Sequence, residues 1–219
     1  MTKLSYLAFE IVRYRGVREP IRIDLTKRSL IPIIGVNESG KTTILHAIFA
    51  FDYYNDRLNN GGRQLQDTFD LNDAFGSNDA EVCAEVELPP DVLKDALTKA
   101  LPEGSRPSLA QVQTSAKRQQ WPSRIRLCRD LGSLKYSCPE LKSVLKLDPT
   151  QQDVVARYLV GQLPYILFFD DFRDSVEDEI PIVKDASGGA SGWLAIMDRL
   201  FQKSSKGKLS VFTLDPDPR

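Results

Sequence analysis

The residues from Gly35 to Thr43 are the part of this sequence whose types and spacing suit a chemical task. They read Gly-Val-Asn-Glu-Ser-Gly-Lys-Thr-Thr and fit the pattern GxxxxGK[ST] at every fixed position. Two glycines allow backbone amides to wrap a polyphosphate, a lysine brings a positive charge to it, and a threonine hydroxyl is a hard oxygen ligand for Mg2+. The sequence therefore predicts a P-loop that binds ATP with Mg2+.

Within this motif we expect Lys41 to contact the β- and γ-phosphates and the Thr42 hydroxyl to hold Mg2+. A helix that begins at Lys41 would direct its free amides and the positive end of its dipole toward the phosphates. The predicted cofactor-binding residues of the loop are Gly35, Asn37, Glu38, Ser39, Gly40, Lys41, Thr42 and Thr43.

The elements around the motif follow from the spacing of apolar residues. Leu30 to Ile34 is a short apolar run that leads directly into Gly35, which predicts a strand, and the helical pattern begins at Gly40. Further strands are expected at 4–14, 21–25, 81–88, 124–127 and 165–169, and helices at 90–101, 151–162 and 193–201. Residues 102–120 form a polar connector rich in Pro, Ser and Gln. The sum is a mixed α/β chain.

The first 52 residues resemble the N-terminus of the RecF/SMC/OLD-like ATPases. The resemblance rests on Phe9 to Val17, on Ile21 to Leu25 and on the motif with its helix. It implies an α/β P-loop NTPase of ABC/SMC-head type, a mixed sheet with antiparallel N-terminal strands around the P-loop helix. It also implies that Arg15 lies near the nucleotide, and that two heads enclose two ATP molecules and act on DNA in repair or anti-phage defence.

On this resemblance residues 1–219 form a single ATP-binding domain with a polar insertion at 102–120, the N-terminal part of a larger head. Such a head also needs a Walker B strand, a signature motif and a switch histidine. Tyr165 to Asp171 has the shape of a Walker B strand, which makes Asp170 and Asp171 candidate catalytic residues, or it is an earlier strand of the sheet. Residues 187–189 and 209–216 resemble a signature and a Walker B, but Ala186 and Ala190 depart from the pattern and no Glu follows Asp215.

Residues 101–150 carry nine basic and four acidic residues, a balance of +5. Their cations interleave with Trp121, so contact with DNA phosphates is one hypothesis and a solvated strand face is the other. The candidate DNA contacts are Lys117, Arg118, Arg124, Arg126 and Arg129. The acidic run from Asp170 to Glu179 suggests a two-metal nuclease or, more simply, a solvated loop.

Three cysteines, Cys83, Cys128 and Cys138, are widely spaced, and His46 is the only histidine. A zinc site therefore has too few ligands, and reduced structural thiols are expected. The longest apolar run, Tyr165 to Phe169, is too short to span a bilayer, so we expect no membrane contact and a cytoplasmic location.

Three functions compete at this point. The first is an ATP-driven, DNA-associated ATPase that works as a homodimer or larger assembly. The second is a nucleotide-sensing module that does not hydrolyse ATP and gates a partner effector or nuclease. The third is a nuclease that the P-loop regulates.

Overall fold

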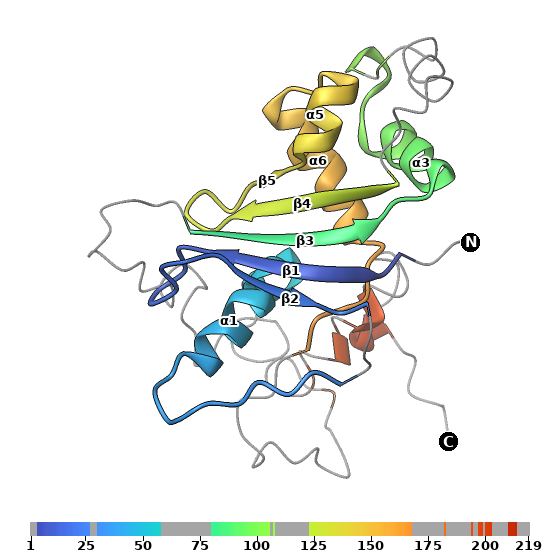
Figure 1. Cartoon of the computed structure of the whole chain (residues 1–219). Coiled ribbons are helices and arrows are strands. Elements are labelled where there is room, and N and C mark those ends of the chain that lie inside the picture. The colour runs from blue at the N-terminus through green and yellow to red at the C-terminus, as the bar shows by residue number, and fades with distance from the viewer. Residues whose placement is uncertain are drawn as a thin grey trace, which may run out of the picture.

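The computed structural model describes most of the first 57 residues and most of the region from 80 to 167 (Figure 1). The described residues are 4–26, 30–57, 80–105, 107, 123–167, 182, 194, 197–198, 200–202 and 210–213. The candidate residues Lys117, Arg118, Asp170 and Asp171, and the signature-like residues 187–189, lie outside them.

A five-stranded sheet with the order β2-β1-β3-β4-β5 forms the centre of the molecule. Each neighbouring pair of strands is antiparallel. The strands are β1 (Tyr6–Val12), β2 (Ile21–Asp24), β3 (Glu81–Glu87), β4 (Arg124–Asp130) and β5 (Tyr136–Ser137). The alternation of side chains along β1, β2 and β3 predicted these strands, because successive residues point to opposite faces of a sheet.

Helix α1 packs against β1 and β3, whereas α5 contacts β4 and α6 contacts both β5 and α3 (Figure 1). Helix α6 begins with a capping box, in which Asp148 and Gln151 each bind the backbone of the other. The helices are α1 (Lys41–Phe51), α3 (Pro90–Ala100), α5 (Pro139–Leu145) and α6 (Pro149–Val160). Short 3-10 turns lie at η1 (Tyr53–Arg57), η3 (Glu103–Ser105) and η4 (Val211–Thr213), and residues 194, 197–198 and 200–202 are helical.

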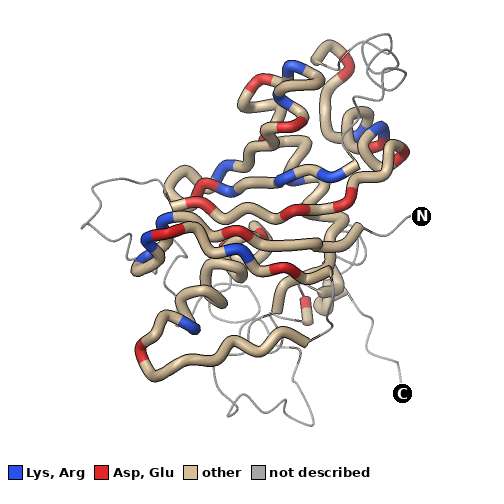
Figure 2. The backbone as a smooth tube through the Cα atoms, in the orientation of Figure 1, with Lys and Arg blue, Asp and Glu red and all other residues tan. Residues whose placement is uncertain are grey.

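The two faces of the sheet differ in chemistry. The face toward α1 is apolar, and Phe9 meets Phe51 of α1 edge to face with ring centroids 5.6 Å apart. Its other fully buried apolar residues are Ile11, Val82, Ala84, Val86, Ile125 and Leu127. The opposite face carries charged side chains, with Glu85 of β3 paired to Arg124 of the adjacent β4 and to Arg22 of β2, on the far side of β1. Figure 2 shows the acidic residues of β3 beside the basic residues of β4.

The mixed α/β class that the sequence predicts is confirmed, but the described sheet is antiparallel throughout rather than mixed. The prediction of a strand at Leu30 to Ile34 is wrong. Those residues are not in a strand, and Leu30 and Ile34 are 80% and 89% exposed. A strand requires a hydrogen-bonding neighbour, and none of the described strands pairs with this segment.

The strand expected at 165–169 also fails within the described residues. Residues 165–167 are not in a strand, and the middle of the second Walker B-like segment is the 3-10 turn η4. None of the described helices is long and apolar enough to cross a membrane.

Candidate functional site

Steric demands explain both glycines of the motif. Gly40 has φ +86°, in the left-handed region that a side chain rarely adopts, and it forms the N-cap of α1. At Gly35 a Cβ atom would lie 2.6 Å from the Ser39 hydroxyl oxygen. Glu38 is also left-handed, with φ +64°. The chain therefore turns tightly between Gly35 and Gly40, and the N-terminus of α1 faces the loop.

Lys41 folds back over this loop. Its ammonium group donates to the carbonyl oxygens of Gly35 and Val36, at 2.9 and 2.6 Å, and lies 3.4 Å from the Ser39 hydroxyl oxygen. These are partly exposed contacts between a charged donor and neutral acceptors. A phosphate oxygen carries more negative charge than a carbonyl, so the ammonium group can exchange a loop carbonyl for a phosphate.

A pocket of about 180 Å³ opens at the N-terminus of α1. It is lined by Glu38, Ser39, Gly40, Lys41, Thr42 and Thr43. No side chain caps this end of the helix, and the first intrahelical bond runs from the Ile44 amide to the Gly40 carbonyl, at 3.1 Å. The amides that precede Ile44 are thus directed toward the pocket with the positive end of the helix dipole. This arrangement suits an anion.

The predicted site residues fall into three groups. The six residues from Glu38 to Thr43 come together in the pocket, and Gly35 shapes the loop behind them. Asn37 lies in the exposed turn of the same loop, and Thr42 is exposed in the first turn of α1. Arg15 lies in the turn between β1 and β2, over the ring of Tyr14, and its approach to a nucleotide stays a prediction.

The C-terminal end of α1 is anchored by a buried cation. Arg129 of β4 is fully buried and donates to the carbonyl of Ala50, at 2.6 Å, and to the carboxylate of Asp56, also at 2.6 Å. A positive charge at this end of a helix complements the negative end of its dipole. Arg129 thereby ties the helix that carries Lys41 to the sheet.

Two polar side chains complete this anchor. The Tyr136 hydroxyl donates to the Phe51 carbonyl, and the Asn55 amide donates to the Phe49 carbonyl at 2.8 Å. Burial raises the pKa of Tyr136, so the hydroxyl keeps its proton and remains a donor. Sequence reasoning missed Tyr136, Asn55 and the anchoring role of Arg129. The one available signal was the position of Arg129 on the Ile125 and Leu127 side of an alternating strand.

The DNA-contacting surface predicted from residues 101–150 needs correction. Arg129 cannot belong to it, because its side chain is fully buried on the opposite face of β4 from Arg124 and Arg126. Arg126 lies 3.3 Å from Glu140 and 3.8 Å from Glu10, and Arg124 lies 3.7 Å from Glu85. Carboxylates therefore already compensate Arg124 and Arg126, the two candidate DNA contacts that remain among the described residues.

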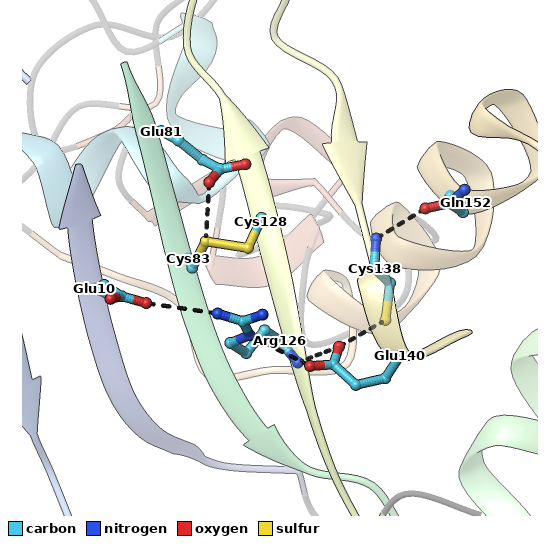
Figure 3. The surroundings of a disulfide bond; sticks show 8 residues. All are labelled: Glu10, Glu81, Cys83, Arg126, Cys128, Cys138, Glu140 and Gln152. Atoms are coloured by element: carbon cyan, nitrogen blue, oxygen red, sulfur yellow. Dashed lines mark hydrogen bonds and ion pairs between the residues drawn. A yellow bond between two sulfur atoms is a disulfide. The ribbon is translucent and has the colours of Figure 1, made fainter. Parts of the chain in front are cut away.

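The expectation of separate reduced thiols is also wrong for two of the three cysteines. Cys83 and Cys128 form a disulfide between β3 and β4 (Figure 3). They are 45 residues apart in sequence but directly opposite each other in the strand register. Cys138 is a buried free thiol, and burial raises its pKa to about 12.

Comparison with family models, with curated proteins and with solved structures gives no match for this chain. The interpretation of the pocket therefore depends on its own geometry and on the motif.

Proposed function

We propose that this chain binds a nucleoside triphosphate, ATP together with Mg2+, in the pocket at the N-terminus of α1. One observation carries the proposal: Lys41, the uncapped first turn of α1 and the left-handed Gly40 converge on a single pocket. The charge and the amides both favour a highly charged anion over a neutral ligand. Thr42 supplies the hard oxygen that Mg2+ prefers.

The proposal includes the wider fold and assembly that the resemblance to RecF/SMC/OLD-like ATPases implies. Residues 1–219 would be the ATP-binding N-terminal lobe of an ABC/SMC-type head, working in the cytoplasm in DNA repair or anti-phage defence. Two copies would associate through their heads, with ATP between them. Among the candidate DNA contacts, this proposal retains Lys117 and Arg118, which lie outside the described residues.

Calorimetric titration of MgATP into wild type and the Lys41→Ala variant tests the binding proposal. The variant loses the only cation that lines the described pocket. We expect its affinity for MgATP to fall at least about tenfold, or about 1.4 kcal/mol. Lys142→Ala serves as the matched control, because it removes an exposed lysine from α5 and should leave the affinity unchanged.

An equal affinity in wild type and Lys41→Ala would contradict the proposal. So would an equal loss in both lysine variants, since that result would indicate an effect of net charge rather than of the pocket.

The composition of the pocket also favours the second candidate, a nucleotide sensor that gates a partner effector or nuclease. Among the residues that line it, Glu38 is the only carboxylate, and it belongs to the loop itself. Hydrolysis requires a carboxylate that orients the attacking water and groups that stabilise charge on the γ-phosphate. The described residues thus include groups that can bind a nucleotide, but they provide fewer of the groups that its hydrolysis requires.

A further inference from the structure

The outer face of β3 and β4 gathers two sulfurs and a carboxylate. Cys83 of β3 and Cys128 of β4 are directly opposite in the antiparallel register, and their Cα atoms are 3.9 Å apart. Glu81 lies two residues before Cys83, so it projects from the same face of β3. Its Oε2 atom is 3.5 Å from the Cys83 sulfur (Figure 3). The three potential ligand atoms all lie within 4.8 Å of one another.

Reduction would convert this cluster into a set of metal ligands. A thiol reductant transfers two electrons and two protons to the Cys83–Cys128 disulfide, breaks its S–S bond and is itself left as a disulfide. Two thiols then face each other across the strand pair beside a carboxylate. Thiolates favour Zn2+ over the hard cations Mg2+ and Ca2+, and a zinc ion accepts sulfur and carboxylate oxygen together.

Contrary to the expectation from the sequence that zinc would find too few ligands, we propose that the reduced chain binds one Zn2+ ion through Cys83, Cys128 and Glu81, and that formation of the disulfide closes this site. Binding displaces one proton from each thiol, so the ion replaces two protons. In tetrahedral coordination with Zn–S bonds of about 2.3 Å, the two sulfurs stand roughly 3.8 Å apart. Side chains on directly opposed residues of neighbouring strands can span that separation.

A second carboxylate lies near the cluster. Asp130 is directly opposite Glu81 and adds a second carboxylate at this end of the strand pair. Cys83 and Cys128 are buried and Glu81 is half-buried. The ion would therefore be held within the surface of the sheet. Water fills the fourth position of a tetrahedral ion with three protein ligands.

Zinc titration of the reduced chain tests the proposal. The full chain is reduced with a phosphine, which is oxidised to the phosphine oxide with an oxygen atom from water. This reductant leaves no dithiol that could compete with the protein for zinc. We expect one ion per chain and a Kd below about 1 µM. About two protons should be released per ion, a number measured by repeating the calorimetry in buffers of different ionisation enthalpy. The oxidised chain should bind at least about tenfold more weakly. Substitution by Co2+ should give a thiolate-to-metal charge-transfer absorption.

Matched variants assign the ligands. Cys83→Ser should abolish the charge-transfer band, and Glu81→Gln should weaken zinc binding at least about tenfold while both sulfurs remain. Cys138→Ser is the control for the thiol, because Cys138 lies outside the cluster. Glu87→Gln is the control for the carboxylate, because it is an exposed residue of the same strand and the same face. Both controls should bind zinc as wild type does.

Zinc should also raise the melting temperature of the reduced chain, since a ligand that binds only the folded state stabilises it. The melting temperature remains informative if the reduced chain is partly unfolded without metal, because zinc would then restore its structure. A reduced chain that binds no zinc below about 10 µM and gains no stability from it would overturn the proposal. Zinc binding that persists unchanged in Cys83→Ser, or equally in the oxidised chain, would overturn it as well.

Discussion

At the residue scale, Gly35 lies so close to Ser39 that a side chain at position 35 would displace the Ser39 hydroxyl. A Cβ at residue 35 would lie 2.6 Å from the Ser39 hydroxyl oxygen but 3.4 Å from the Ser39 Cβ. We therefore expect Gly35→Ala to reshape the loop and weaken MgATP binding about tenfold or more, measured by calorimetry. Removing the hydroxyl in Gly35→Ala/Ser39→Ala should restore most of the affinity, because the remaining contact is an ordinary one.

Two controls make this a test of the stated contact. Ser39→Ala alone gives the affinity that the double variant should approach, because Ser39 itself lines the pocket. Gly104→Ala should have no effect, because a Cβ at that position meets nothing within 4 Å. Failure of the double variant to regain affinity would show that Gly35 is required for another reason, such as close contact with the ligand.

At the element scale, α1 depends on its anchor to the sheet as well as on its own sequence. Arg129→Met keeps much of the side-chain volume but removes two charge-assisted hydrogen bonds and leaves Asp56 without its cation. We expect urea unfolding to show a loss of about 2–4 kcal/mol. Because a loosened α1 carries Lys41, MgATP binding should weaken in the same variant.

Arg124→Met is the control on the same strand. Its side chain is 63% exposed and lies 3.7 Å from Glu85, so its loss should change stability by less than about 0.5 kcal/mol. Equal effects of the two substitutions would refute a special role for Arg129.

At the scale of the whole molecule, we expect this chain alone to bind ATP and to hydrolyse it very slowly. Phosphoryl transfer depends on positioning and charge stabilisation, and Lys41 with Mg2+ provides only part of both. A head of the proposed type receives further groups from a second copy, and each missing 1.36 kcal/mol of barrier stabilisation costs a factor of ten in rate.

A steady-state phosphate-release assay measures this directly. Turnover near ~1 per second that Asp171→Asn abolishes would reverse the expectation and promote Asp171 to a catalytic or metal-positioning residue. Turnover that appears only at high protein concentration would instead indicate that two chains assemble the active form.

Local patterns were sufficient for much of the fold and for the candidate pocket. The start of α1 at Lys41, and strands β1 and β3 follow from residue spacing, because helix and strand periodicities involve near neighbours in sequence. The same is true of the pocket residues, since Gly40, Lys41 and Thr42 are consecutive and one short turn brings them together.

Only the tertiary structure decided the features that depend on distant segments. The strand expected at Leu30 to Ile34 did not form, because a strand exists only where another segment supplies its hydrogen bonds. Arg129 was expected at the surface, yet the carbonyls of α1 and the Asp56 carboxylate compensate its charge and allow burial. Cys83 meets Cys128 because strand register pairs residues 45 positions apart, and register is set by the packing of the whole sheet rather than by either cysteine's neighbours.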